Sequence, residues 1–113
     1  MRRLLCVLVL IAAPSLADIS AKAAELLLYT RKSCAYCQLW ERQIGPIYPK
    51  TAEAALAPLR RIDLDRADGG GPALDPPVAI TPTFVLMDGE REVARFSGYS
   101  DDLPFWSVLA TQI

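Results

Sequence analysis

The chain of 113 residues contains no histidine and only three cysteines. Structural zinc usually takes four ligands from these two residue types, so one copy of the chain cannot complete such a site from them. A strong excess of charge is also lacking: 12 basic and 13 acidic side chains give a net charge of −1. Nothing in this balance indicates a nucleic acid or an anionic membrane as a partner. The remaining composition, 52% hydrophobic, is typical of one compact domain.

The N-terminal residues have the pattern of a secretory signal. Two arginines precede an apolar run over residues 4–13, and Ser15-Leu16-Ala17 supplies small residues for a cleavage site. We therefore interpret residues 1–17 as a signal peptide, with cleavage as late as residue 23 or 24 also open. A membrane anchor is the alternative, but a bilayer needs about twenty apolar residues, twice the length of this run. The signal predicts a periplasmic protein whose folded domain spans residues 25–113.

The segment from Leu26 to Cys37 carries the main chemical feature. The apolar run Leu26 to Thr30 has the length of a strand, and after a short loop Cys34-Ala35-Tyr36-Cys37 opens a helix-like segment. Cysteines three apart on a helical turn face the same way, so their sulfurs can pair. Closing so short a loop stabilises a fold by only about 2 kcal/mol. A helix N-terminus favours a thiolate, so the pair is better suited to redox chemistry than to stabilising the fold.

The rest of the chain predicts an alternation of helices and strands. A helix from about Cys34 to Ile44 is followed by a kink and a short second helical piece, because Gly45-Pro46 and Pro49 interrupt the backbone hydrogen bonds. Strands are expected at Leu59 to Leu64, in the run Thr81 to Met87 and from Glu90 to Phe96. A closing helix is expected over Leu103 to Gln112, capped by Asp101 or Asp102.

Two turn-rich segments lie between these elements. Residues 66–77 are dominated by glycine and proline, so no strong helix is expected there. Their triple glycine at 69–71 precedes no Lys-Ser or Lys-Thr pair and fits no Gly-x-Gly-x-x-Gly frame, which argues against a nucleotide site. Asp88-Gly89 between two strand-like runs predicts a hairpin with a type I′ turn, in which both residues would have positive φ.

These features together resemble the thioredoxin fold over residues 25–112. The resemblance rests on a strand leading into Cys34-Ala35-Tyr36-Cys37, on Thr81-Pro82-Thr83 at the head of a hairpin, and on a closing helix. It implies an α/β protein with a central mixed sheet of about four strands flanked by helices, the second of them degraded. It also implies a cis bond at Thr81–Pro82, beside the disulfide. With the signal, the chain is most similar to small periplasmic thioredoxins found with bacterial sulfur-oxidation systems.

The resemblance assigns roles to named residues. Cys34 would be the attacking thiolate and Cys37 the resolving cysteine, while Tyr36, Thr81 and Pro82 would line the surface that binds substrate. The redox disulfide would be the only cofactor, with no metal. Protein thiols and disulfides would be the partners, and a membrane electron donor would supply electrons if the protein is a reductase. The resemblance favours a reductase of protein disulfides, with a thiol oxidase or isomerase of the same fold as the alternative.

The sequence also departs from the family pattern. Cytoplasmic thioredoxins carry a buried acid six residues before the first cysteine, where this chain has Leu28. The proton acceptor for Cys37 must then be water, Glu41 or another carboxylate. Arg31 and Lys32 could lower the pKa of the Cys34 thiol or point into solvent. Two other classes stay open: a zinc site that bridges two copies, and a binding module with a permanent disulfide and no catalysis.

Overall fold

The computed structural model describes residues 24–66 and 69–113. The proposed signal at residues 1–17 lies outside the described residues. Eight elements follow in order: β1 (Ala24–Thr30), α1 (Ala35–Gln43), the 3-10 helix η2 (Tyr48–Lys50), α2 (Ala52–Leu56), β2 (Leu59–Asp63), β3 (Thr83–Asp88), β4 (Arg91–Ser97) and α3 (Asp102–Gln112). The strands form one mixed sheet in the order β2-β1-β3-β4, in which only the β1–β2 pair is parallel.

The two central strands are buried on both faces of the sheet. Leu26, Leu27, Leu28 and Tyr29 of β1 are all at most 4% exposed, and the first five residues of β3 are equally buried. Because side chains alternate across a strand, such runs feed two separate cores. The uninterrupted apolar run that predicted a strand at Leu26 to Thr30 therefore belongs to β1, a central strand of the sheet.

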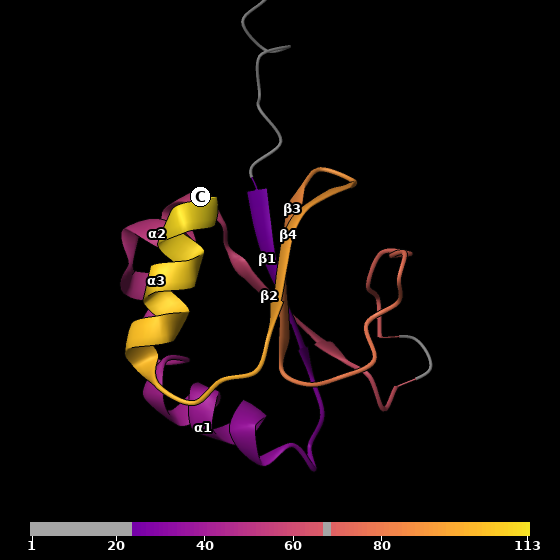
Figure 1. The fold of residues 1–113 in the computed structure, drawn as a ribbon, viewed down its shortest axis with the longest axis horizontal. Helices are drawn as coiled ribbons and strands as arrows, with labels where there is room; N and C mark the ends of the chain where they lie inside the picture. The colour runs from indigo at the N-terminus through magenta and orange to yellow at the C-terminus, as the bar shows by residue number, and fades with distance from the viewer. Residues whose placement is uncertain (1–23, 67–68) are drawn as a thin grey trace, which may run out of the picture.

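All helices cover one face of the sheet, as Figure 1 shows. Under them lies a core of aromatic rings in which Trp40 of α1 contacts Phe84 of β3 and Phe105 of α3, with ring centroids 5.5 and 5.7 Å apart. The side chain of Trp40 is fully buried. Such ring pairs add to the stabilisation that burial alone provides.

The other face of the sheet is covered without a helix. The described residues between β2 and β3 form turns, bends and loop, and Leu74 and Val78 from this segment pack on the second core beside Ile62 and Val85. The segment forms no helix because glycine and proline have the lowest helix propensities. The predicted degraded second helix, expected between the second and third strands, is thereby confirmed, since the described residues between β2 and β3 contain no helix.

The hairpin between β3 and β4 is confirmed, but its predicted turn type is wrong. Asp88 is still in β3 and pairs with Arg91, so the two turn residues are Gly89 and Glu90. Gly89 has φ +61°, and no described residue other than glycine has positive φ. A turn with glycine at its first central position and positive φ there alone is of type II′. The Asp88-Gly89 dipeptide correctly indicated a hairpin. The pairing of the strands makes Gly89 the first central residue of the turn, whereas the predicted turn made it the second.

The last helix begins as the sequence indicates. Asp101 is its N-cap, in extended backbone, and its Oδ1 accepts a hydrogen bond from the backbone N–H of Asp102 at 2.7 Å. Phe105 and Leu109 are buried against the sheet. Trp106 is only partly buried and stacks on Tyr48, with ring centroids 6.1 Å apart.

Tyr48 is expected to make the folded protein less stable as the pH rises into the alkaline range. Its hydroxyl donates to the backbone oxygen of Ala57 at 2.5 Å, and burial, with a contribution from Glu53, raises its pKa from 10.0 to about 12. Between these values the unfolded chain has released a proton that the folded chain still holds. The contribution to stability is therefore complete below pH 10 and is lost as the pH rises through about 12, at about 1.4 kcal/mol per pH unit.

We expect Tyr48→Phe to flatten this part of the stability profile. Urea unfolding at pH 8, 10 and 11.5 measures it, with the wild type losing more stability over the range than the variant. Some slope should persist in the variant, because burial also raises the pKa values of Tyr29 and Tyr99. Identical slopes in the two proteins would show that Tyr48 does not retain its proton in the folded state.

Candidate redox site

The cysteine pair lies where β1 leads into α1. Cys34 is the N-cap residue of α1, with extended backbone, and its sulfur accepts a hydrogen bond from the N–H of Cys37 at 3.1 Å. The loop before it is held by the side chain of Gln38, which donates to the backbone oxygen of Lys32 at 2.6 Å. An N-cap sulfur thus faces unpaired backbone N–H groups and the positive end of the helix dipole.

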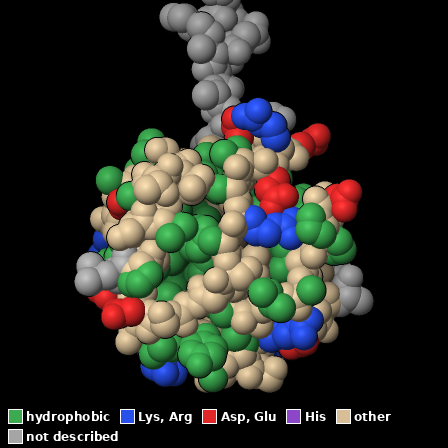
Figure 2. Space-filling model, in the orientation of Figure 1, with side chains coloured by type: hydrophobic (Ala, Val, Ile, Leu, Met, Phe, Trp, Pro, Cys, Tyr) green, Lys and Arg blue, Asp and Glu red, His purple; other side chains and the backbone are tan. Residues whose placement is uncertain are grey.

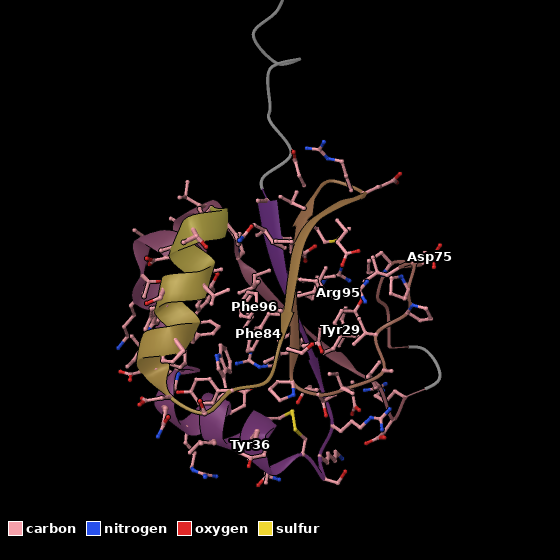
Figure 3. All side chains as sticks on the ribbon, viewed as in Figure 1. Tyr29, Tyr36, Asp75, Phe84, Arg95 and Phe96 are labelled. Atoms are coloured by element: carbon pink, nitrogen blue, oxygen red, sulfur yellow. A yellow bond between two sulfur atoms is a disulfide. The ribbon has the colours of Figure 1, made fainter. Side chains whose placement is uncertain are left out.

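The two cysteines form a disulfide whose sulfurs differ in access. Their Cα atoms are 5.2 Å apart. Cys37 is 1% exposed, whereas Cys34 is partly exposed. In Figure 3 the bond lies beside the labelled Tyr36, which is 61% exposed. A visiting molecule can therefore reach Cys34 and not Cys37.

The segment with Thr81 and Pro82 lies at the same end of the sheet. Thr83 at the start of β3 pairs with Tyr29 near the end of β1, so the residues just before β3 lie beside the loop that leads to Cys34. The Thr81–Pro82 bond is cis, as the resemblance implied. A second cis bond, Asp75–Pro76, carried no sequence signal.

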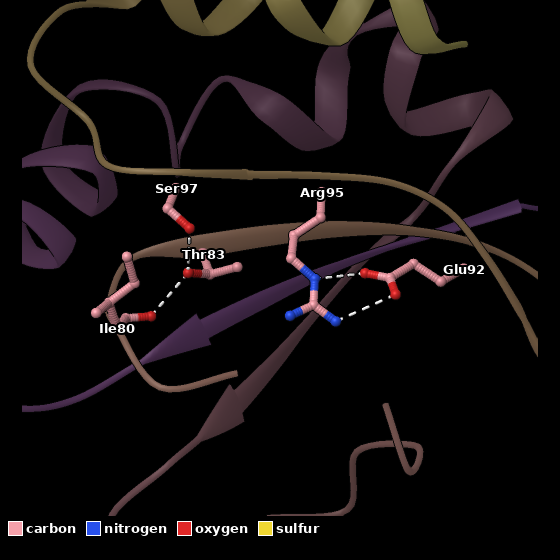
Figure 4. A network of polar contacts seen from close by, with 5 residues as sticks. All are labelled: Ile80, Thr83, Glu92, Arg95 and Ser97. Carbon is pink, nitrogen blue, oxygen red and sulfur yellow. Dashed lines mark hydrogen bonds and ion pairs between the residues drawn. The ribbon is translucent and has the colours of Figure 1, made fainter. Parts of the chain in front are cut away.

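Hydrogen bonds from two strands hold this segment in place. The hydroxyl of Thr83, which is 1% exposed, donates to the backbone oxygen of Ile80 and also hydrogen-bonds the hydroxyl of Ser97, both at 2.7 Å (Figure 4). The N–H of Gly98 donates to the oxygen of Pro82 at 2.8 Å. Gly98 has φ +88°, a backbone conformation that residues other than glycine rarely adopt. Sequence reasoning named Thr83 only as part of the Thr81-Pro82-Thr83 motif and assigned no role to it or to Gly98, although a glycine directly after a strand is a recognisable signal.

The charged groups near the cysteines are mostly paired with each other. Glu41 receives two hydrogen bonds from Arg61, at 2.5 and 2.8 Å, and this bond raises the pKa of the arginine. Arg31 lies 3.7 Å from Asp65. Leu28, at the position where cytoplasmic relatives carry an acid, is 0% exposed in the helix-side core. Both carboxylate oxygens of Glu41 are thus engaged by Arg61.

Two hollows flank the site. The first, which we call the apolar groove, has a volume of about 460 Å³ and is lined by residues of α1, β4 and α3. Figure 2 shows hydrophobic side chains in a hollow between α3 and β4. The second, the charged pocket, has a volume of about 500 Å³ and includes Cys37 in its wall. Main lining residues of the groove are Tyr36, Phe96, Tyr99, Pro104, Phe105 and Val108; those of the pocket are Arg31, Lys32, Cys37, Glu41, Arg42 and Asp63.

Within residues 24–66 and 69–113 there is no group of three or more cysteine, aspartate or glutamate side chains placed to hold a metal ion. The same residues form no helix with the length and hydropathy needed to cross a bilayer. The chemistry that this part of the chain displays is that of the disulfide.

Comparisons with known proteins agree on the fold. No family model matches the chain, and no curated protein does. The crystal structure of the periplasmic thioredoxin SoxS from Paracoccus pantotrophus, in reduced form, is similar with a TM-score of 0.72. The two sequences are 39% identical, and the match covers 79% of this chain and 94% of that one.

More distant thioredoxins share the architecture. A thioredoxin from Fasciola hepatica has a TM-score of 0.64 at 19% identity, covering 87% of this chain and 88% of its own. The germline-specific thioredoxin Deadhead from Drosophila melanogaster has a TM-score of 0.63 at 21% identity, covering 86% and 88%. At these identities the likeness concerns the fold alone.

Proposed function

The chain belongs to the thioredoxin family and is a thiol-disulfide oxidoreductase, and from this premise we propose that it reduces protein disulfides in the periplasm through Cys34 and Cys37. One observation carries the proposal: an accessible sulfur at a helix N-terminus is paired with a buried one. That asymmetry suits a cycle in which the first cysteine meets the substrate and the second acts only within the protein.

The reaction begins with the protein in its dithiol form. The Cys34 thiolate attacks one sulfur of a substrate disulfide, and the other substrate sulfur leaves as a thiolate. The Cys37 thiol loses its proton and attacks the Cys34 sulfur, which releases the second substrate thiolate. Two electrons have then passed to the substrate, and the Cys34–Cys37 disulfide has formed. Because Glu41 is held by Arg61, we assign the proton of Cys37 to water in the charged pocket.

Substrate contacts are assigned to residues around the disulfide. Tyr36 offers an exposed ring in the dipeptide between the cysteines. Thr81 and Pro82 lie at the same end of the sheet, and in the family the backbone before the cis proline pairs with an extended substrate strand. The hydrogen bonds of Gly98 and Thr83 support this role because they fix the segment from both sides.

Two observations support the proposed periplasmic setting. Residues 1–17 have the features of a signal peptide, and SoxS of Paracoccus pantotrophus is itself periplasmic. A reductase in that compartment needs electrons from across the membrane, so we propose a membrane protein as donor. By resemblance, proteins of sulfur oxidation are the proposed substrates.

Equilibration with glutathione at defined ratios tests the direction. Thioredoxin-like proteins range from about −270 mV for reductants to about −120 mV for oxidants, and we expect a value below about −200 mV here. The protein should also reduce insulin when dithiothreitol regenerates it. A potential near −120 mV would assign an oxidase or isomerase instead. A protein with no turnover in either direction would be a binding module.

A further inference from the structure

The hollows on either side of the disulfide differ in chemical character. Tyr36 lines the apolar groove and Cys37 lines the charged pocket, so each hollow includes one residue of the Cys-x-x-Cys motif. Tyr36 is visible beside the disulfide in Figure 3. Lys32, two residues before Cys34, lines the charged pocket, and Tyr36, two residues after it, lines the apolar groove.

The apolar groove is built to receive a bulky apolar side chain. The rings of Tyr36, Phe96 and Phe105 line it, and Val108 contributes from α3. Its wall is fixed to the redox helix, because the hydroxyl of Tyr99 donates to the side-chain oxygen of Gln43 on α1 at 2.6 Å. No lysine or arginine is among the described residues that line it, and its one charged group is Asp101.

The charged pocket has unbalanced positive charge. Arg31, Lys32 and Arg42 line it together with two carboxylates, and the first of these, Glu41, is neutralised by Arg61. Arg31 lies 3.7 Å from Asp65. Lys32 and Arg42 are exposed and have no ion pair among the described residues, so they exceed the remaining Asp63 by one charge.

We propose that the groove and the pocket form one docking surface for a substrate segment of matching polarity. The segment is extended, with a bulky apolar residue on one flank of its reactive cysteine and acidic residues on the other. The apolar residue occupies the groove, and the acidic residues face Lys32 and Arg42. This inference rests on the proposed reductase function and adds the class of substrate. Charges at the rim of such a surface act mainly on the association rate.

Disulfide-linked peptide dimers test the proposal. Each peptide has a single cysteine, with phenylalanine on one flank and two glutamates on the other, and is made in both flank orders. A second set replaces the glutamates by lysines, and a third replaces the phenylalanine by glycine. For each peptide dimer, we divide the rate at which the dimer oxidises the reduced protein by the rate at which dithiothreitol reduces the same dimer. This ratio corrects for the intrinsic reactivity of each peptide disulfide.

For two surface charge pairs we expect the glutamate peptide to react about tenfold faster than the lysine peptide at low salt, with the ratio falling towards one in high salt. Replacing phenylalanine by glycine should slow the reaction several-fold. The double variant Lys32→Glu/Arg42→Glu should invert the preference. Lys50→Glu makes a similar change at an exposed lysine that lines neither hollow, and should keep the wild-type ratio.

A wild-type ratio near one at low salt, or a ratio that survives in the double variant, would overturn the docking proposal. Neutral 2-hydroxyethyl disulfide separates this result from a failure of the proposed function. If the wild type reduces it but ignores peptide charge, only the docking surface is wrong. If no disulfide is reduced, the reductase function fails and the docking proposal fails with it.

Discussion

Replacing Cys34 by serine is expected to reduce disulfide turnover by at least about a thousandfold, because a serine hydroxyl does not ionise at neutral pH and cannot attack a disulfide. The remaining thiol does not compensate, since Cys37 is 1% exposed. Insulin reduction coupled to dithiothreitol measures the loss. Turnover within tenfold of the wild type would mean that Cys37 reaches substrates directly.

The opposite variant, Cys37→Ser, should capture its substrate. Cys34 still attacks, but nothing resolves the product, so a mixed disulfide accumulates that reductant releases on a non-reducing gel. The double variant without either cysteine is the control for adventitious adducts. A Cys37→Ser protein that forms no covalent complex with any protein or peptide disulfide would support a passive module.

Phe84→Ala is expected to be the most destabilising simple change in the core. The ring is 0% exposed and lies 5.0 Å from both Phe96 and Phe105, between β3 and the helices. Removing such a ring leaves a cavity and costs about 3–5 kcal/mol. In a domain of this size that lowers the melting temperature by about 15–30 °C.

Val93→Ala is the matched control, because this side chain is 46% exposed on the same hairpin. It should change stability by at most about 0.5 kcal/mol. Thermal unfolding followed by circular dichroism compares the two variants. Similar melting temperatures for both would mean that the aromatic cluster is not the main core of the protein.

Much of the fold is predictable because the signals are local. The apolar run of β1 and the glycines and prolines after α1 act within a few residues. The Cys-x-x-Cys spacing is local in the same way. The turn type was not predictable, since Gly89 marks a hairpin without fixing which turn position it occupies.

The surroundings of the site depend on contacts between distant parts of the chain. Tyr99 and Gln43 are 56 residues apart, and Glu41 meets Arg61 across 20. No periodicity in the sequence indicates such pairs, because each member is an ordinary polar residue of its own element. The same holds for the bond from Gly98 to Pro82, which appears only when β4 lies beside β3.

The central claim is that the Cys34 sulfur carries negative charge more readily than an ordinary thiol. The direct test is the ultraviolet absorbance of the thiolate, titrated against pH in the reduced Cys37→Ser variant, with the double cysteine variant as baseline. Backbone N–H groups and the helix dipole should lower the thiol pKa well below the value of about 8.5 for free cysteine. A thiol that ionises at about 8.5 or above would contradict the account.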